Sequence, residues 1–354
     1  MEEKKKLVFR SDAAFLPEIG TGHLIRCIGM ADSLVYKGLV KKSEISFISR
    51  SEGPYYIGFE LIERSGYKRE DISDNCLDWN SEEEAEVITE IDPHLLVVDR
   101  LSTELKWMSI VKCKVKHVVS MDDIGSGASL ADTVINGIIH INPNCKSSFI
   151  GYDYLFLSAP KISSQIDISR KAKRFCASFG GYDSRNLMGF FLSTMKNCDI
   201  SIVKGALIEL LVGSESEEKI KKWKYQAKEV SFKYNIDVAL HIRPDNFMEK
   251  LENADLAILS GGLTIFDAVS RGIPVIGIPQ YRHQLITIEK LSEKMAAVGG
   301  SKKMTLDENF FSGLINRMIR SKMERLSMKR VGPKLIDGEG RERITNLLSK
   351  FLYC

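Results

Sequence analysis

The sequence VFRSD at residues 8–12 is followed, after a short loop, by EIGTGHLIR at residues 18–26. The apolar start of the first stretch predicts a β-strand, and the run after the glycines predicts an amphipathic helix. Gly20, Gly22 and His23 therefore fall at the turn between a first strand and a first helix. In an open α/β sheet such a turn lies at the ligand-binding edge, where free backbone N–H groups and the helix dipole attract anions.

Short apolar runs alternate with longer amphipathic stretches along the rest of the chain, as expected for parallel strands joined by crossover helices. Strands are predicted at Leu7–Arg10, Ile45–Ile48, Leu95–Asp99, His117–Ser120, Thr133–Ile135, Arg174–Phe179, Ile208–Val212, Val238–His241, Leu256–Leu259 and Val275–Ile278. Helices are predicted near His23–Lys37, Ser81–Ile91, Thr103–Cys113, Leu306–Arg320 and Gly340–Leu352. The predicted fold class is α/β, with two Rossmann-like domains built on parallel sheets.

The periodicity is lost over residues 151–169, where YDYLFLSAP runs into the polar SSQ. Such a segment predicts a linker between domains. We expect an N-terminal domain at 1–160 that carries His23, and a C-terminal nucleotide-binding domain at 161–335. The last helix, at 336–354, is set apart because it could pack back on the first domain.

The composition excludes several classes of protein. The 354 residues carry 50 Lys and Arg against 47 Asp and Glu, so no nucleic-acid partner is expected. No apolar run is long enough to span a membrane, and the N-terminal MEEKKK has no apolar stretch of a signal sequence. Seven cysteines are scattered without a Cys-x-x-Cys pair, which favours reduced thiols and a cytoplasmic location. The oligomeric state stays open.

Position distinguishes His23 from the other histidines. A histidine at a helix start is often no more than a polar residue there. His23, however, follows the carboxyl end of a predicted strand and two glycines that let a ligand approach closely. His94 and His117 stand at the beginnings of strands, on the opposite rim, and are interpreted as structural. An imidazole at the ligand-binding edge can act as a general base.

Two further glycine-rich turns follow predicted strands in the second half. One contains Gly180 and Gly181, and the other is the run Ser260-Gly261-Gly262-Leu263-Thr264. Backbone N–H groups at the start of a helix suit a diphosphate. Asp267, one turn later, could accept a hydrogen bond from a ribose hydroxyl, or it could only pair with the helix dipole. Together the turns favour a nucleotide site in the second domain.

Cofactor and metal sites fit the sequence less well. Ile25 replaces the third glycine of the dinucleotide motif Gly-x-Gly-x-x-Gly, and the second strand ends in Ser49-Arg50 instead of an acid, so a nicotinamide cofactor is not expected. Asp122-Asp123 could bind a divalent metal, but no third carboxylate stands at metal-loop spacing. We expect no cofactor and no metal, and a structural or substrate-positioning use of this acidic pair.

An ordered set of motifs resembles the UDP-2,4-diacetamido-2,4,6-trideoxy-β-L-altropyranose hydrolase family of pseudaminic acid biosynthesis and the related spore coat polysaccharide proteins. The motifs extend over about residues 7–300 and read FRSD, IGTGHLIRC, VVD, MDD, NP, SFGG with Asp183, NL, and SGGLT. These families have the glycosyltransferase-B fold. The resemblance implies a UDP-sugar substrate and a metal-independent hydrolysis, in which water displaces UDP at the anomeric carbon with inversion.

The resemblance also implies roles for single residues. His23 matches the catalytic histidine. The implied substrate-binding residues are Asp12, Gly20, Gly22, Arg26, Asp122 and Gln284. The implied nucleotide-binding residues are Gly180, Gly181, Ser260, Gly261, Gly262, Leu263, Thr264 and Asp267. The chain departs from the family at Asp267, which replaces a glutamate, and at Arg282-His283, which replace the first two residues of a Glu-Asn-Gln turn. These departures point to another amino sugar or another acceptor.

Three functions are open at this point. A UDP-sugar hydrolase is the leading interpretation. A glycosyltransferase of the same fold would use the same base and diphosphate site but pass the sugar to an acceptor hydroxyl. A nucleotide-sugar sensor would keep the pocket without the chemistry, and the presence of His23 disfavours it. Release of UDP without an added acceptor would separate the first two.

Overall fold

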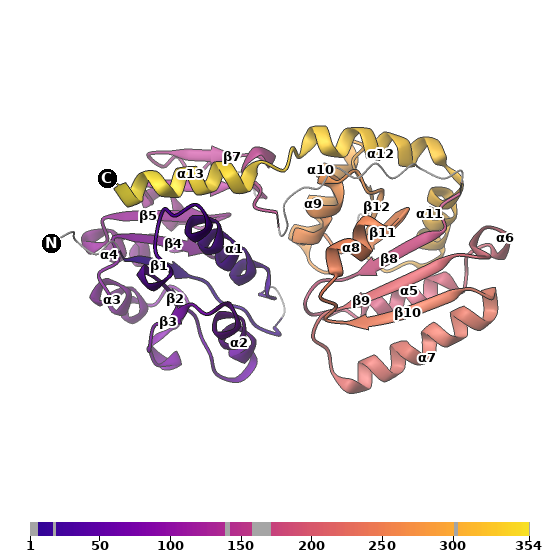
Figure 1. Cartoon of the computed structure of the whole chain (residues 1–354), viewed down its shortest axis with the longest axis horizontal. Helices are drawn as coiled ribbons and strands as arrows, with labels where there is room; N and C mark the ends of the chain where they lie inside the picture. The colour runs from indigo at the N-terminus through magenta and orange to yellow at the C-terminus, as the bar shows by residue number, and fades with distance from the viewer. Residues whose placement is uncertain (1–5, 17–18, 139–141, 158–170, 301–303, 354) are drawn as a thin grey trace. The chain divides into compact units, whose positions relative to one another are not determined.

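The computed structural model describes residues 6–16, 19–138, 142–157, 171–300 and 304–353 (Figure 1). The chain divides into two compact units. Unit 1 comprises Met1–Ser158 and Gly338–Cys354, and unit 2 comprises Ala159–Asp337. Each unit is a parallel β-sheet with helices on both faces, which confirms the predicted α/β class with two Rossmann-like sheets.

Unit 1 has a seven-stranded sheet in the order β3-β2-β1-β4-β5-β6-β7. Its strands are β1 Leu7–Arg10, β2 Ile45–Ile48, β3 Lys68–Arg69, β4 Leu95–Asp99, β5 His117–Met121, β6 Thr133–Asn136 and β7 Ser148–Ile150. Its α-helices are α1 Gly22–Tyr36, α2 Tyr56–Ser65, α3 Glu82–Glu90, α4 Leu105–Lys114 and α13 Gly340–Tyr353. Short 3₁₀ helices occupy Lys42–Glu44, Gly53–Tyr55, Asp74–Cys76, Ser126–Leu130 and Tyr152–Tyr154. Because β1 pairs with both β2 and β4, the carboxyl ends of these three strands lie side by side.

The sheet of unit 1 is buried on both faces. Phe9 packs in the cluster under α1, α2 and α13, whereas its neighbour Val8 packs in the cluster under α3 and α4. Successive side chains of a strand point to opposite faces, so two apolar neighbours serve two cores. This explains why the strands read as continuous apolar runs.

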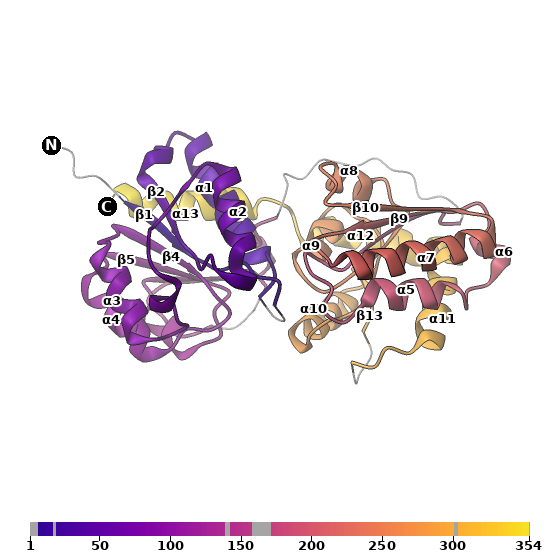
Figure 2. The ribbon, with the colours of Figure 1, turned by 90° about the horizontal axis from the view of Figure 1, so that it is seen from below.

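The last helix of the chain, α13, lies along α1 (Figures 1 and 2). Leu348 and Leu352 of α13 are buried in the core beneath α1. The carbonyl of Phe351 lies 3.0 Å from His94 Nε2, and the Tyr353 hydroxyl donates to the carbonyl of Leu39. The C-terminal helix is therefore part of unit 1, although unit 2 separates it from the rest of unit 1 in the sequence.

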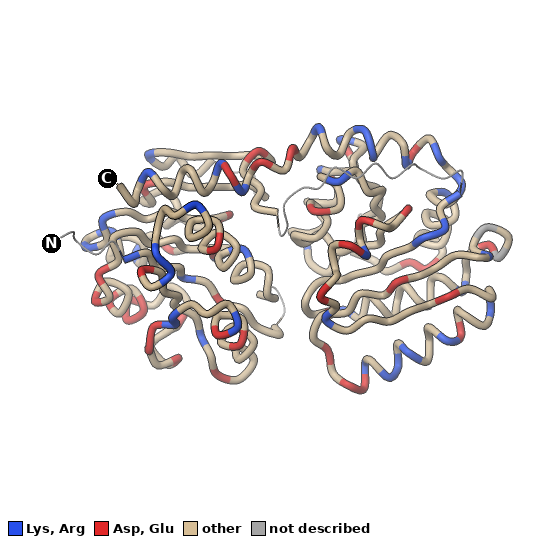
Figure 3. The backbone as a smooth tube through the Cα atoms, in the orientation of Figure 1, with Lys and Arg blue, Asp and Glu red and all other residues tan. Residues whose placement is uncertain are grey.

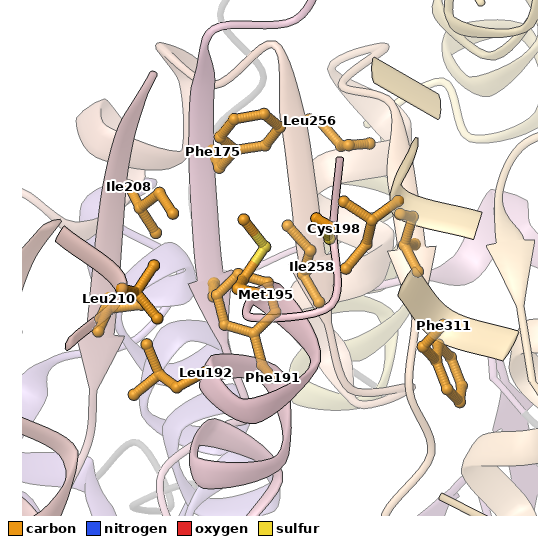
Figure 4. Packing of buried hydrophobic residues seen from close by; sticks show 14 of the residues in the cluster. Phe175, Phe191, Leu192, Met195, Cys198, Ile208, Leu210, Leu256, Ile258 and Phe311 are labelled. Atoms are coloured by element: carbon orange, nitrogen blue, oxygen red, sulfur yellow. The ribbon is translucent and has the colours of Figure 1, made fainter. Parts of the chain in front are cut away.

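Unit 2 has a six-stranded sheet in the order β10-β9-β8-β11-β12-β13. Its strands are β8 Arg174–Ser178, β9 Leu207–Val212, β10 Asp237–Ile242, β11 Leu256–Leu259, β12 Val275–Gly277 and β13 Val298–Gly299. Its helices are α5 Leu187–Met195, α6 Ile200–Val203, α7 Glu217–Tyr234, α8 Phe247–Glu252, α9 Leu263–Ser270, α10 Arg282–Glu293, α11 Glu308–Arg320 and α12 Lys322–Leu335. Figure 4 shows Phe175 and Ile258 of the sheet in one core with Phe191 and Met195 of α5.

The predicted strands and helices are present to within a few residues, but the helix α2 was not predicted. Three short strands, β3, β7 and β13, were not predicted, because two or three edge residues carry too little apolar pattern. The helix predicted from Thr103 begins at Leu105, since Thr103 instead bonds to Asp123. In the predicted linker, residues 152–154 form a 3₁₀ helix, and residues 158–170 lie outside the described part of the chain.

Charged residues of both signs are spread along both units (Figure 3). Glu217 and Glu218 begin α7, for example, and lysines follow along that helix. Within the part of the chain that the structure describes, no helix combines the length and the apolar character needed to cross a bilayer.

Candidate active site

The turn between β1 and α1 positions His23. Gly20 has φ +59°, a left-handed conformation that glycine adopts without steric cost. The amide of Ala14 donates to the carbonyl of Gly20, which closes the loop on itself. Helix α1 then begins at Gly22, and the imidazole of His23 in its first turn is about one quarter exposed. Gly20 and Gly22 thus shape the turn.

His23 pairs with Asp99, a residue that was not predicted from the sequence as part of the site. His23 Nδ1 lies 2.7 Å from Oδ1 of Asp99, the last residue of β4, whose side chain is fully buried. In a neutral imidazole this bond keeps the proton on Nδ1 and leaves Nε2 as an acceptor. Nε2 of His23 has no hydrogen-bond partner among the described residues. The pair is therefore arranged for proton abstraction at Nε2.

Arg26 holds the carboxylate of Asp99 in place. Its Nε donates to Asp99 Oδ2 at 2.7 Å, and its Nη2 donates to Asp99 Oδ1 at 2.6 Å. Burial alone would raise the pKa of Asp99, but the charge of Arg26 and the contact with His23 hold this pKa well below its usual range. Asp99 is therefore a carboxylate at neutral pH.

The structure corrects the predicted roles of Arg26 and Asp122. Both were expected to bind substrate, but both side chains are buried and pair with each other. Asp122 also accepts a hydrogen bond from the amide of Ile138 at 2.8 Å. The two residues position Asp99, and neither is among the residues that line the cavity beside His23. Asp123, the second residue of the acidic pair, accepts bonds from Thr103 and Ser120 and fixes a loop.

A cavity of about 300 Å³ adjoins His23, and we call it the unit 1 cavity. It is lined by Asp12, Ile19, His23, Arg50, Tyr55, Trp79, Asp99, Arg100 and Leu101. Asp12 is the expected substrate-binding residue that lines it. Its carboxylate accepts bonds from Arg10, from the amide of Arg50 and from Trp79 Nε1, so it ties together the loops that form the wall.

In unit 2, the turn between β11 and α9 offers a helix start without a side-chain cap. Gly262 is the N-cap residue, and no side chain of the described residues bonds to the first N–H groups of α9, at Leu263 and Thr264. These groups also have no partner within the helix. A Cβ on Gly261 would lie 2.4 Å from the carbonyl oxygen of Gln284, so glycine is required there. At Gly262 a Cβ would meet nothing closer than 3.9 Å.

The second glycine turn of unit 2 lies beside the first. Gly180 has φ +85°, and a Cβ built on it would lie 4.0 Å from both Ser260 Oγ and Gln280 Nε2. The carbonyl of Gly181 accepts a bond from the amide of Ser214. Gly180, Ser260, Gly261 and Gly262 therefore converge at the carboxyl ends of β8 and β11, as the sequence motifs predict for a diphosphate site.

Asp267 and Gln284, which were expected to bind the nucleotide and the substrate, contact other groups of the protein instead. Asp267 was expected to bind a ribose, but its carboxylate is buried and pairs with Arg271 of the same segment. It is therefore turned toward the interior. Gln284 was expected to contact substrate, but its Oε1 accepts a bond from the amide of Gln280 at 2.9 Å. Its Nε2 remains near Gly262 and faces the turn.

Of the nine residues that line the unit 1 cavity, seven were not predicted from the sequence as site residues, among them Asp99, Arg100, Arg50, Tyr55 and Trp79. Asp99 could have been found, because it ends a predicted strand next to β1, at the same sheet edge as His23. Arg100 and Arg50 follow the ends of β4 and β2 and carried the same signal. Tyr55 ends a short 3₁₀ helix and Trp79 lies in a turn, and the sequence gives no spatial position for either.

Comparison with known proteins identifies the fold. No family model matches the chain. The chain is 24% identical over 348 residues to the spore coat polysaccharide biosynthesis protein SpsG of Bacillus subtilis, and the match covers 94% of each protein. Among solved structures it is similar to MurG of Acinetobacter baumannii, with a TM-score of 0.67 and 11% identity over 98% of this chain and 99% of that one. It is also similar to the spinosyn forosaminyltransferase SpnP, with a TM-score of 0.62 and 13% identity over 99% and 100% of the two chains. The chain has the glycosyltransferase-B fold.

The comparisons also correct the leading functional interpretation. The sequence motifs favour a UDP-sugar hydrolase, with a glycosyltransferase as the alternative. SpnP, a solved structure similar to this chain, is a transferase. SpsG, which is similar to this chain over nearly its whole length, is a polysaccharide biosynthesis protein. These findings contradict the hydrolase and favour the alternative. They support kinship with the spore coat polysaccharide protein but not the specific hydrolase family of the resemblance.

Proposed function

We propose that the protein is a glycosyltransferase that passes a sugar from a nucleoside diphosphate donor to an acceptor hydroxyl. The observation that carries this proposal is the pair of His23 and Asp99 at the wall of the unit 1 cavity, with Nε2 of His23 unpartnered among the described residues. A base held in this way can activate a hydroxyl that enters the cavity.

The reaction follows from the pair. His23 Nε2 takes the proton of the acceptor hydroxyl while the acceptor oxygen forms a bond to the anomeric carbon. The bond between that carbon and the diphosphate oxygen breaks, and the nucleoside diphosphate leaves with the electron pair. A direct displacement of this kind inverts the anomeric centre. The Asp99 carboxylate orients the imidazole and stabilises the imidazolium that forms, as in other Asp-His pairs.

Unit 2 would bind the donor. The uncapped start of α9 presents N–H groups to the diphosphate, and the helix dipole adds a favourable field for the negative charge that develops on it. Gln284 Nε2 would add a side-chain donor beside Gly262. We expect the nucleotide to be UDP, because the resemblance to the UDP-sugar family implies it. Because Asp267 is buried, groups other than its carboxylate would accept the hydrogen bonds of the ribose hydroxyls.

The shape of the unit 1 cavity favours transfer to an organic acceptor. Its volume of about 300 Å³ is that of a small-molecule site, and its wall combines the rings of Tyr55 and Trp79 with polar groups. Aromatic faces of this kind pack against the apolar face of an organic molecule. A site for one water molecule would need neither the volume nor the rings.

A transfer assay tests the proposal. The full chain is incubated with a panel of UDP-sugars, with and without a library of neutral and acidic saccharide acceptors, and both UDP and glycosylated product are measured by mass spectrometry. We expect product and UDP to appear together and only with an acceptor. His23→Ala is expected to lose most turnover and to keep its affinity for UDP in calorimetry.

His241→Ala is the matched control, because His241 is similarly exposed, pairs with Glu209 of unit 2 and lies outside the proposed site. It should retain turnover. Full activity of His23→Ala, or failure of the wild-type chain to bind UDP, would contradict the proposal.

A further inference from the structure

Arg100 carries a positive charge that the protein compensates only in part. Its side chain is 1% exposed, and its Nη2 bonds to Glu84. Nε and Nη1 of Arg100 are buried and have no hydrogen-bond partner among the described residues. A buried donor without a partner is costly, so such groups commonly mark a place where a ligand or water belongs.

The carboxylate that Arg100 uses is shared. Glu84 Oε1 also accepts bonds from Nε and Nη2 of Arg10, at 2.8 and 2.6 Å, and Glu84 Oε2 accepts one from Trp107. Burial and the neighbouring charge of Arg10 lower the pKa of Arg100. One carboxylate therefore serves two guanidinium groups, and Arg100 is the less well paired of the two.

Arg50 adds a second incompletely paired guanidinium to the same cavity. Its Nη1 donates to the Tyr55 hydroxyl, and its Nη2 lies 3.2 Å from Asp78, whose side chain is 80% exposed. An exposed ion pair of this kind is worth little. The Nε of Arg50 is buried and has no partner in the described part of the chain.

The guanidinium groups around the cavity differ in how well they are paired. Arg10 bonds to the buried carboxylates of Asp12 and Glu84, Arg100 shares Glu84, and the side chain of Arg50 is paired with the exposed carboxylate of Asp78. His23, held by Asp99, lines the same cavity, so guanidinium groups and a base belong to one site.

We propose that the unit 1 cavity binds an acceptor sugar that carries a carboxylate, with the carboxylate held at Arg50 and Arg100 and the reacting hydroxyl directed to His23. This inference rests on the proposed transferase function and names its acceptor class. The N–H groups of Arg50 and Arg100 that have no partner among the described residues would donate to the carboxylate, and the ring of Trp79 offers a face for the sugar.

A singly charged carboxylate fits better than a phosphate. Asp12 lines the same cavity. Burial would raise its pKa, but Arg10 and Arg100 hold that pKa well below its usual range, so Asp12 is charged. A single ligand charge can pair with the two guanidinium groups, whereas the second charge of a phosphate would be opposed by Asp12 at close range in a site of low dielectric constant.

Binding of simple sugars tests the acceptor class on the full-length chain. The probes are glucuronate, glucose and glucose 6-phosphate, and the dissociation constants are measured by ligand-observed NMR titration. We expect glucuronate to bind at least about tenfold more tightly than glucose, the size expected for a charge-assisted hydrogen bond. Glucose 6-phosphate is expected to bind more weakly than glucuronate. Equal binding of glucuronate and glucose, or tighter binding of glucose 6-phosphate, would overturn the proposal.

Two variants test whether Arg50 and Arg100 cause the preference for glucuronate over glucose. Arg100→Gln and Arg50→Gln should each reduce the preference for glucuronate over glucose, while Arg64→Gln, on the exposed face of α2, should keep it. Arg50 lies nearer the surface than Arg100, so Arg50→Gln remains informative if Arg100→Gln does not fold. A preference that survives in Arg50→Gln and in folded Arg100→Gln would contradict the assignment.

The test of the acceptor class can fail without a failure of the proposed transferase function. UDP binding and acceptor-dependent UDP release report on transfer itself. In the transfer assay, a carboxylated acceptor should show a raised KM and a nearly unchanged kcat in Arg50→Gln. Transfer to neutral acceptors alone would overturn the acceptor class and leave the transferase intact.

Discussion

His23 Nδ1 lies 2.7 Å from Asp99 Oδ1, although 76 positions separate the two residues in the sequence. The sheet order explains the contact. Strand β4 pairs directly with β1, so the last residue of β4 and the helix start that follows β1 share one edge of the sheet. The pairing also fixes which carboxylate the imidazole meets. The base is therefore built by topology and not by a local motif.

The first prediction concerns Asp99→Asn. The neutral amide cannot stabilise the imidazolium and can favour the wrong tautomer of His23, so kcat should fall by a factor on the order of 10² to 10⁴. Calorimetry should show unchanged UDP affinity, because the donor turns belong to unit 2. Since the two residues act as one unit, His23→Ala combined with Asp99→Asn should be hardly slower than His23→Ala alone. Multiplied losses in the double variant would argue against the pair.

Asp122→Asn is the control for the structural contribution of Asp99. It also removes a carboxylate from Arg26, but it does not touch His23. It should destabilise unit 1 and reduce kcat much less than Asp99→Asn does. A comparable drop in kcat, at equal folded fraction by circular dichroism, would show that Asp99 supports catalysis through Arg26 and not through the imidazole of His23.

The two glycines of the α9 turn make opposite predictions. Gly262→Ala places a methyl group 3.9 Å from its nearest neighbours, Gln284 Nε2 and Ser260 Oγ, so the chain should fold normally, but the methyl group would obstruct a diphosphate at the helix start. Gly261→Ala forces a Cβ against the backbone of Gln284 and should lower the thermal unfolding temperature. Calorimetry with UDP and a thermal melt of each variant check both outcomes. Unaltered UDP affinity in Gly262→Ala would move the diphosphate away from this turn.

The sequence predicted the sheets because apolar periodicity is a local signal. Residues such as Phe9 and Val8 bury opposite faces of one strand, and the pattern needs no knowledge of the partner strands. It also indicated the glycine turns, since Gly20 and Gly180 adopt positive φ values that favour glycine. Orientation was not predictable. Whether a polar side chain points into a cavity or into an ion pair depends on neighbours that are distant in sequence.

Asp267 and Asp99 illustrate that limit. The sequence assigns Asp267 to a ribose, yet Arg271, one turn later, draws its carboxylate into the interior. Conversely, Asp99 reads as the polar end of a buried strand, and only the adjacency of β1 and β4 makes it the partner of His23. Candidate residues could be found from motifs, but their roles required the pairing of the strands.

Gln284→Glu tests the amide nitrogen at the donor turn. A carboxylate keeps an acceptor for the amide of Gln280, so the local fold should persist, but it replaces the Nε2 donor beside Gly262 with negative charge. UDP should bind at least about tenfold more weakly, because a donor is lost and a like charge is added. Uridine, which has no phosphate, should bind the variant and the wild type alike. An equal loss for uridine and UDP would indicate a general distortion of the turn.

The last prediction concerns acid stability. Burial opposes the charge on Asp99, but Arg26 and His23 lower its pKa in the folded protein below the value of about 3.9 expected in the unfolded chain. The unfolded state therefore binds more protons as the pH falls through about 4, so this stabilisation is complete above that pH and is lost progressively below it. Asp99→Asn should be less stable than the wild type at pH 7 and should show a shallower loss of stability below pH 4. Urea unfolding followed by circular dichroism from pH 3 to 7 measures both curves, and parallel curves would mean that Asp99 is not the titrating group.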